Sequence, residues 1–345
     1  MNKSFTEILE KISMHDHLTD HEASLAMKLI LHGDISDEEI AAFLLGMRMK
    51  GETVVELTSF VQEMRSVAVP VEVDTKHAVD LCGTGGDKSG TFNISTTAMF
   101  IVAGAGVPVL KHGNRSVSSK SGSYDVLELL GAVPNLQKKQ VEELFNKTGM
   151  AFMFAPNFHP AMKYVMPARR ALKMRTFFNI LGPLVNPANV KCQVIGAFNK
   201  ETAKKMIQIL GNLHTENAYT VNAHDGLDEV STTSQSEIFE LKTHLSGDSV
   251  TFDPISLGYE KTDHNSLLGG DAKQNAQILM NVLEGKSTKA QRDIAELNAL
   301  FAIRASNITD DLEEAKEMAV RSIDSGEAGK KLDQFIKESQ AIAAG

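Results

Sequence analysis

The chain contains no tryptophan and only two cysteines among its 345 residues. Cys82 and Cys192 lie far apart with no CxxC spacing, which excludes a disulfide framework and is typical of a reducing compartment. A membrane-spanning run is also absent, because the longest apolar stretch, residues 98–110, is too short to cross a bilayer and is interrupted by glycine and proline. Residues 1–18 carry acidic side chains where a signal peptide requires an apolar segment. We therefore expect a soluble cytoplasmic protein with no membrane segment.

Basic residues are in the minority, since 35 Lys and Arg stand against 44 Asp and Glu and give a net charge of −9. Non-specific nucleic-acid binding requires Lys and Arg clustered on a broad face, so this balance argues against it. A local anion pocket is still possible. With 42% hydrophobic residues and no internal repeat, the chain is expected to fold into about two domains rather than to be disordered.

Residues 1–72 are predicted to form an all-helical domain. Thr19 with Glu22, and Ser36 with Glu39, have the spacing of a capping box, in which two side chains bond the backbone N–H groups that a helix start leaves free. We expect Gly51 to end the second of these helices and a third helix to cover residues 54–66. Apolar residues recur with the helical period of 3.6, so no strand is needed here.

Residues 73–345 alternate between short apolar, β-branched segments and helical patterns. Strands are expected at 77–82, 107–112, 151–156, 192–198, 217–223 and 237–242. Helices are expected at 95–106, 126–131, 157–172, 200–213, 270–284, 287–306 and 310–325. This alternation predicts an α/β fold, with a mostly parallel central sheet covered by helices, attached to the smaller helical domain.

A glycine-rich loop, Gly83 to Asp87, follows the first expected strand. Glycine lets backbone N–H groups approach an anion closely, and a helix N-terminus favours negative charge. Two standard nucleotide motifs fail by register, because Lys88 stands where GxGxxG needs its third glycine and Thr91 stands where a P-loop needs lysine. For such a loop in isolation, a simple tight turn is the alternative.

Two polar clusters follow strand ends downstream of this loop. The first lies at the start of the next expected helix, and the second follows the next strand; together they comprise Asn93, Ser95, Thr96, Lys111, His112, Asn114, Arg115, Ser116, Ser118, Ser119, Lys120 and Ser123. If the two strands are parallel neighbours, both loops emerge at the same edge of the sheet and converge on one anion site. Each cluster alone could equally be a solvated loop.

An acidic pair, Asp228 and Glu229, follows the expected strand at 217–223. Adjacent carboxylates can hold a hard cation, and Mg²⁺ often uses only one or two of them together with substrate phosphates and water. In isolation this pair is better explained as a solvated acidic turn, whereas opposite a phosphate loop it is a candidate metal site.

These pieces, in this order, resemble the anthranilate phosphoribosyltransferase family. The resemblance is carried by AAFLLGMRMKGET, DLCGTGGDKSGTFNISTTA, VLKHGNRSVSSKSGSYDVLELLG, HPAMKYVMPARRALKMRTFFNILGPLVNPA and DGLDEVS, spread over most of residues 1–300. It implies transfer of the phosphoribosyl group of 5-phosphoribosyl 1-diphosphate (PRPP) to the amino group of anthranilate, with Mg²⁺ as cofactor. It also implies a homodimer formed through the helical domain, and a helical segment near 168–190 that returns to that domain.

The resemblance assigns site residues position by position. Contacts to PRPP are implied for Gly83, Gly86, Asp87, Thr91, Asn93, Ile94, Ser95, Thr96, Lys111 and Ser123, with the cradle continued by His112, Gly113, Asn114, Arg115, Ser116, Val117, Ser118 and Ser119. Ser95, Asp228 and Glu229 are implied to bind Mg²⁺. Asn114 and Arg169 are implied to contact anthranilate, with His112 and His159 along its entry path. Tyr124 stands where the family has a small residue.

The chemistry agrees with these assignments, because an aromatic amine is already a nucleophile and needs no activated Ser or Cys. No GxSxG elbow is present and no general base stands out. Catalysis would then come from stabilising the departing diphosphate and from positioning the amine. Two alternatives stay open at this point: a pyrimidine nucleoside phosphorylase-like enzyme, which shares the architecture but lacks the KHGNR string, and a non-catalytic nucleotide- or nucleic-acid-binding relative.

Overall fold

The computed structural model describes residues 3–87, 89–115, 121–243 and 245–345. Its N-terminal part is helical, as predicted, and contains α1 (Lys3–Ser13), α2 (Asp20–His32), α3 (Asp37–Lys50) and α4 (Val54–Ser66). Both predicted capping boxes are present, and Gly51 caps the end of α3. A third capping box, at Thr53 and Glu56, starts α4.

The α/β part is built on one sheet, and its described strands are β1 (Val79–Gly83), β2 (Val109–Gly113), β3 (Met150–Phe154), β4 (Cys192–Gly196), β5 (Asn217–Ala223), β6 (Ser236–Lys242), β7 (Leu245–Ser246) and β8 (Val250–Phe252). The order is β3-β2-β1-β4-β5-β6-β7, with β8 also paired to β6. Strands β1 to β5 are parallel, whereas β6 to β8 are antiparallel. The predicted α/β class with a mostly parallel sheet is confirmed.

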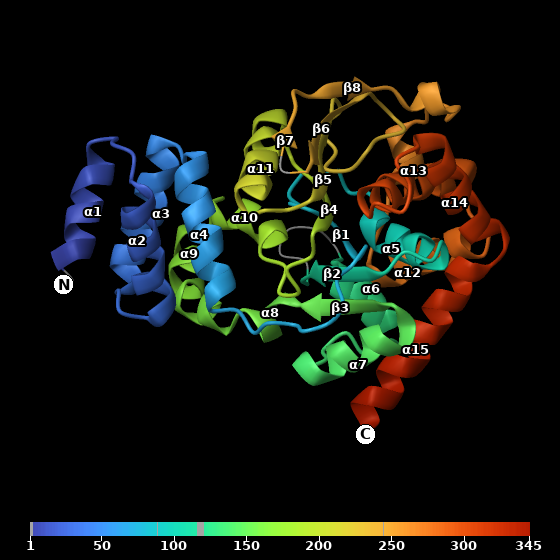
Figure 1. The fold of residues 1–345 in the computed structure, drawn as a ribbon, viewed down its shortest axis with the longest axis horizontal. Coiled ribbons are helices and arrows are strands. Elements are labelled where there is room, and N and C mark those ends of the chain that lie inside the picture. Colours follow the sequence, from blue (N-terminus) through green and yellow to red (C-terminus); the bar gives the residue numbers. More distant parts are fainter. Residues whose placement is uncertain (1–2, 88, 116–120, 244) are drawn as a thin grey trace.

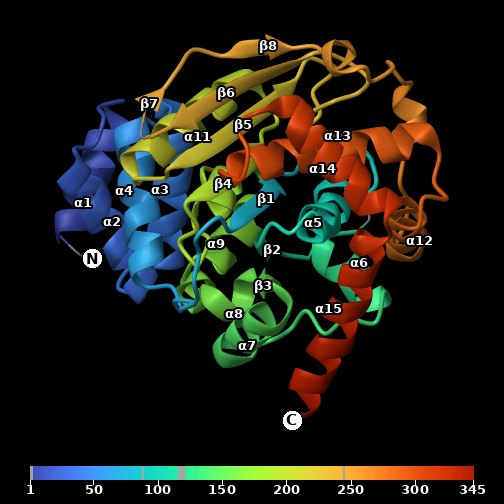
Figure 2. The same ribbon diagram turned by 45° about the vertical axis from the view of Figure 1, so that its right-hand side comes forward.

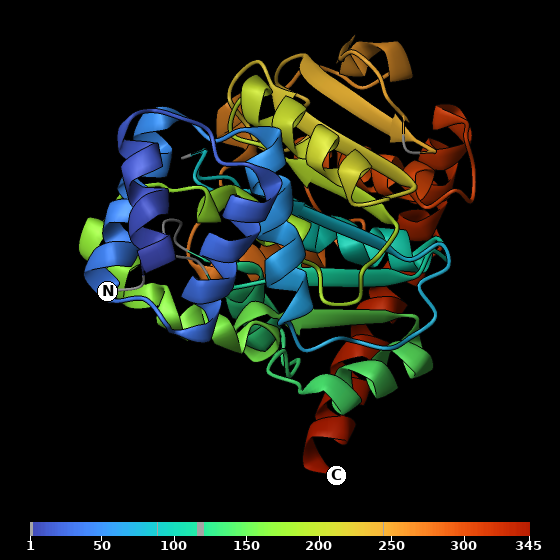
Figure 3. The ribbon, with the colours of Figure 1, turned by 60° about the vertical axis from the view of Figure 1, so that its left-hand side comes forward.

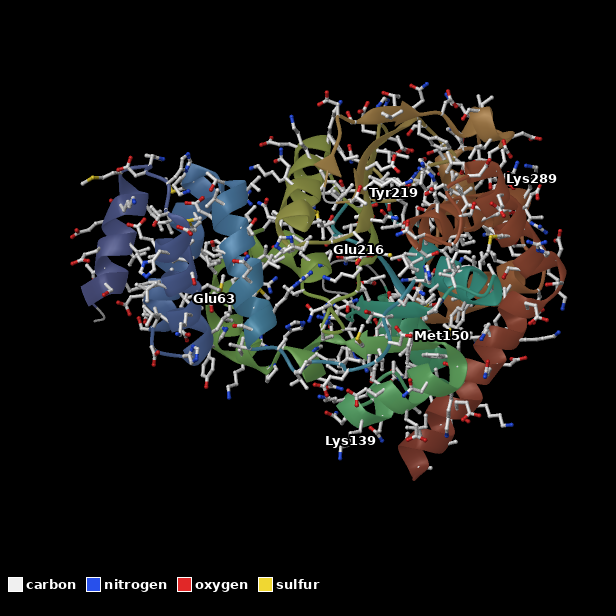
Figure 4. The ribbon with its side chains drawn as sticks, viewed as in Figure 1. Glu63, Lys139, Met150, Glu216, Tyr219 and Lys289 are labelled. Atoms are coloured by element: carbon white, nitrogen blue, oxygen red, sulfur yellow. The ribbon has the colours of Figure 1, made fainter. Side chains whose placement is uncertain are left out.

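The remaining helices cover and extend this sheet (Figures 1 and 2). They are α5 (Ile94–Gly104), α6 (Ser123–Leu129), α7 (Lys138–Thr148), α8 (Ala155–Phe158), α9 (Met166–Leu172), α10 (Phe178–Leu181), α11 (Lys200–Asn212), α12 (Ala272–Leu283), α13 (Lys289–Ala305), α14 (Leu312–Asp324) and α15 (Glu327–Ala344). Met150 and Tyr219 lie inside the sheet layer, whereas Lys139 and Lys289 project from the outer helices (Figure 4). No helix in the described ranges is long and apolar enough to cross a bilayer.

The sheet separates two hydrophobic cores, because successive side chains of a strand point to opposite faces. Leu81 and Val194 belong to the core with α5 and α13, while Cys82 and Ile195 belong to the core with α11 and the N-terminal helices. The second core also includes side chains of α9 and α10, and the views agree that these helices lie beside the N-terminal bundle (Figures 1 and 3).

One expected helix was wrong in extent. The pattern over 157–172 predicted a continuous helix, but the structure breaks it into α8, a 3₁₀ turn at Pro160–Tyr164, and α9. Pro160 and Pro167 lack the backbone N–H that a helix interior needs, so each stands at the start of a new turn. The predicted elements did not include α7, α15, the short strands β7 and β8, or α1 as a separate helix.

Candidate active site

The two polar loops meet at one edge of the sheet, because β1 and β2 are parallel neighbours and both loops follow their carboxyl ends. Thr96 Oγ1, in the first turn of α5, donates to Ser123 Oγ at 2.8 Å. Asn93 Nδ2 donates to the carbonyl of Ser121 at 3.3 Å. The predicted convergence of the two loops is therefore present.

Glycine is required in this loop by close approach as well as by backbone angle. Gly85 and Gly86 both lie in the left-handed region, at φ +67° and +77°. A Cβ at Gly83 would lie 2.5 Å from Asp228 Oδ2, and a Cβ at Gly196, the paired residue of β4, would lie 1.5 Å from the Asp228 carbonyl oxygen. The glycines therefore let the acidic pair pack directly against the loop.

The acidic pair lies against the glycine-rich loop and the start of α5, and is not a solvated turn. Asp228 is 9% exposed, and its Oδ2 accepts a hydrogen bond from Gly85 N–H at 2.7 Å. Glu229 Oε1 accepts from Ser95 N–H at 3.2 Å. Burial and the neighbouring Asp87 raise the pKa of Asp228, and burial and Asp228 raise the pKa of Glu229.

The donor set at this point suits a hard divalent cation. Asp87, Asp228, Glu229 and the Ser95 hydroxyl offer oxygen ligands, and Asp87 Oδ2 is buried with no hydrogen-bond partner in the described part of the chain. The described residues include no group of three or more His, Cys, Asp or Glu arranged to hold a metal ion by themselves. That combination is typical of a site completed by substrate phosphates and water.

Lys111 is buried in β2, where its side chain contacts the Leu81 carbonyl of β1 and the Ser95 hydroxyl of α5. Its side chain is 1% exposed, and its Nζ donates to the Leu81 carbonyl and, at 3.2 Å, to Ser95 Oγ. Its charge lowers the pKa of Glu229 against the effect of burial. Lys111 therefore partly compensates the charge of Glu229.

A second group lies between β2 and the returning helices. The rings of His112 and His159 are 5.0 Å apart, His112 Nδ1 lies 3.2 Å from the Gly182 carbonyl, and the Nε2 atoms of both have no partner within the described ranges. Burial lowers the pKa of His112 to about 3 and that of His159 to about 4, so both are neutral at pH 7. Arg169 is partly buried, with its guanidinium 5.4 Å from the Phe178 ring.

Only part of the KHGNR segment, residues 111–115, lies within the site. Asn114 is exposed, and its Oδ1 accepts from the Arg115 N–H. The Arg115 guanidinium pairs with Asp125 and Glu128 and lies 3.8 Å from the Tyr124 ring, so its charge is already compensated. The predicted residues Ser116, Val117, Ser118, Ser119 and Lys120 lie outside the described residues. The ring of Tyr124 packs on Phe154.

The other predicted residues lie along the same edge. Thr91 Oγ1 is 3.2 Å from Ser89 Oγ, and Ile94 is buried at the start of α5, where only its backbone can reach a ligand. Gly113 ends β2. Sequence reasoning missed two contacts to the loop: His264 Nε2 lies 2.8 Å from the Ser89 carbonyl, and Arg175 donates to the Gly86 carbonyl. Arg175 stands in the RTFFN string, which carried the family resemblance but no assignment for this side chain.

The fold and this site together define a class of enzyme, a glycosyl transferase made of a helical bundle and an α/β domain. Residues 75–329 match the a/b domain of the glycosyl transferase family, and residues 6–68 match its helical bundle domain. The anthranilate phosphoribosyltransferases of Salinibacter ruber and Alkaliphilus metalliredigens are 48% and 46% identical to the chain, over 96% and 97% of it and 98% of each relative.

Solved structures agree. The anthranilate phosphoribosyltransferase of Thermus thermophilus matches with a TM-score of 0.91 and 32% identity, covering 96% of this chain and 99% of that one. The Saccharomyces cerevisiae enzyme in complex with PRPP and Mg matches with a TM-score of 0.90 and 25% identity over 99% of both chains. The chain belongs to the anthranilate phosphoribosyltransferase family. These relatives favour the transferase over the nucleoside phosphorylase and the non-catalytic alternatives.

Proposed function

We propose that the protein transfers the phosphoribosyl group of PRPP to the amino group of anthranilate, giving N-(5-phosphoribosyl)anthranilate and diphosphate, a step of tryptophan biosynthesis. The observation that carries the proposal is the meeting of the Gly83–Asp87 loop, the start of α5 and the acidic pair at one edge of the sheet. That arrangement offers N–H donors and hydroxyls for a diphosphate next to carboxylates for its cation.

In this proposal PRPP lies along the loop edge. Its contacts are made by Gly83, Gly86, Asp87, Thr91, Asn93, Ile94, Ser95, Thr96, Lys111 and Ser123, and by residues 112–119. Mg²⁺ is held by Ser95, Asp228 and Glu229, and when bound it neutralises the charge of the departing diphosphate. The raised pKa values of the two acids support this role, since a cation would offset both the desolvation of the buried carboxylates and the repulsion between neighbouring acids.

The reaction needs little covalent chemistry from the protein. The C1–diphosphate bond breaks through a cationic, oxocarbenium-like transition state, and in this proposal the backbone N–H groups of the glycine-rich loop stabilise the charge of the leaving group. Anthranilate is positioned by Arg169, whose planar fork of donors matches a carboxylate, and by Asn114. The neutral His112 and His159 would line its entry path without adding a charge that competes for the carboxylate.

A homodimer is also proposed. Four large apolar side chains of the helical domain are exposed. They are Leu45 at 40% and Met49 at 66% on α3, Val55 at 52% on α4, and Met14 at 73% directly after α1. Burying such a surface against a second copy would remove apolar area from water. We further propose a division into a helical domain, residues 1–72 with the segment near 168–190, and an α/β domain over 73–345, in a cytoplasmic protein whose two cysteines are free thiols.

The test is to follow anthranilate fluorescence in the presence of PRPP and Mg²⁺. Consumption of anthranilate that requires both PRPP and Mg²⁺ is the expected result. No consumption at high enzyme concentration would reject the proposed function. Phosphorolysis of a pyrimidine nucleoside by inorganic phosphate would indicate the nucleoside phosphorylase instead.

A further inference from the structure

Arg175 bridges three separate parts of the molecule. It lies between α9 and α10, where its carbonyl accepts a hydrogen bond from Arg48 Nη1 of α3 at 2.5 Å. Its guanidinium carbon lies 4.7 Å from the ring centroid of Phe198, which follows β4. Its Nη2 donates to the carbonyl of Gly86 in the glycine-rich loop. The backbone of Arg175 is thus held by the helical domain and its head group by an aromatic ring.

The charge of Arg175 is not compensated by an acid. Other arginines near the surface pair with carboxylates, such as Arg115 with Asp125 and Arg292 with Asp324. Arg175 has no carboxylate within 4.0 Å in the described part of the chain, and its side chain donates instead to the neutral peptide carbonyl of Gly86. A guanidinium has five N–H donors, so most of its capacity and all of its charge stay available beside the loop.

The contact fixes the orientation of one peptide group. A trans peptide is planar, with its C=O and N–H pointing to opposite sides. Holding the Gly86 carbonyl toward Arg175 therefore directs the Asp87 N–H away from Arg175. The N–H groups of Gly86 and Asp87 have no acceptor among the described residues, whereas the N–H groups of Thr84 and Gly85 are bonded to Gly196 and Asp228. The loop keeps two consecutive donors free.

The close approach of the Arg175 guanidinium to Gly86 makes this peptide orientation specific to these two residues. Gly86 is at φ +77°, a backbone conformation that glycine enters and leaves at little cost. The orientation of its peptide group therefore depends on an external restraint. A Cβ at Gly86 would lie 2.8 Å from Arg175 Nη2, so glycine also makes room for the guanidinium. If the Gly86 carbonyl pointed toward the ligand instead, its partial negative charge would lie where the proposed function needs N–H donors.

We propose that Arg175 is a positioning residue for PRPP binding: it turns the Gly86–Asp87 peptide so that the carbonyl faces away from the diphosphate and the free N–H group of Asp87 faces it. This inference rests on the proposed function. It assigns Arg175 no contact with anthranilate and no part in proton transfer.

The test compares Arg175→Gln and Arg175→Lys with Arg170→Gln, which removes the same charge from an exposed arginine nearby whose side chain makes no hydrogen bond or ion pair with the described residues. In Arg175→Gln, kcat/KM for PRPP should fall roughly 10- to 100-fold, the range of one lost charge-assisted hydrogen bond. KM for anthranilate at saturating PRPP should stay within about threefold of wild type. Arg175→Lys should recover part of the loss, because the ammonium still donates to the carbonyl but lacks the planar face that rests on Phe198.

Calorimetric titration with PRPP and Mg²⁺, without anthranilate, gives a readout independent of turnover and should show the same weakening in Arg175→Gln. The inference is overturned if PRPP affinity and kcat/KM in Arg175→Gln stay within about threefold of wild type, or if Arg170→Gln loses as much. Failure of the proposed function is a different result, since wild-type protein would then consume no anthranilate at all.

Discussion

Replacing Asp228 by asparagine should make the ligand-free protein more stable and the enzyme less active. Asp228 is buried and its Oδ2 accepts from Gly85 N–H, while the Asp87 carboxylate lies within hydrogen-bonding reach. Asparagine keeps an acceptor for Gly85 and can turn its amide N–H₂ toward Asp87, whose Oδ2 is buried without a partner among the described residues. The substitution removes an acid–acid contact and adds a donor.

The sign of the pH dependence follows from the raised pKa of Asp228. The folded state holds a proton at pH values where the unfolded chain has already released it, so the contribution of Asp228 to the free energy of unfolding falls as the pH rises above about 4. Asp228→Asn removes that loss, and its advantage over wild type should grow toward neutral pH. At about 1.36 kcal/mol for each pKa unit, we expect a gain of about 1–3 kcal/mol at neutral pH.

Scanning calorimetry between about pH 5 and pH 8 measures this gain, as a rise of a few degrees in Tm for a chain of this size. Glu317→Gln removes one charge from an exposed glutamate whose side chain makes no hydrogen bond or ion pair with the described residues; it is the matched control and should melt like wild type. Turnover of PRPP with Mg²⁺ should fall about 10- to 100-fold in Asp228→Asn. The reasoning is refuted if Asp228→Asn melts at or below wild type at neutral pH, or if its advantage shrinks as the pH rises.

Three further outcomes are expected. Arg169→Gln should raise KM for anthranilate roughly 10- to 100-fold with PRPP binding retained, and Arg169→Lys should recover little of the lost anthranilate affinity. Steady-state kinetics measure this, and an unchanged KM for anthranilate would remove Arg169 from the site. Glu56→Gln should lower the free energy of unfolding by about 3–5 kcal/mol, because it leaves the ammonium of Lys50 unpaired where both side chains are 0% exposed. Urea unfolding should show most of this loss recovered on adding Lys50→Met, and no recovery would contradict the buried-charge explanation. The pKa of His159 is lowered to about 4 by burial, so on acidification the unfolded chain binds the proton first. The contribution of His159 to the free energy of unfolding should therefore fall by up to about 1.36 kcal/mol per pH unit as the pH drops from about 6.5 to about 4. His159→Gln should flatten that part of the stability curve in calorimetry, and identical slopes would show that His159 is not buried in its neutral form.

Local rules made much of the fold predictable from the sequence. The capping boxes at Thr19 and Ser36 and the stop at Gly51 are settled within a few residues of chain, and each appears in the structure as predicted. The alternation of strands and helices gave the α/β class, since parallel strands need helical crossovers. The pattern failed over 157–172, where prolines outweighed the apolar periodicity. It predicted the strand at β6 but not its antiparallel direction, which depends on how the chain returns to the sheet.

The sequence by itself determined which residue types stand at the site: glycines in the loop, hydroxyls at the start of α5, and the acidic pair. Only the tertiary structure decided how they meet. Asp228 lies 143 residues from Gly85 and yet accepts its N–H, Lys111 turns inward to the Leu81 carbonyl, and Arg175 reaches Gly86 from 89 residues away. The physical reason is that burial and charge compensation depend on which strand ends are adjacent, and strand order is a property of the whole sheet rather than of any segment.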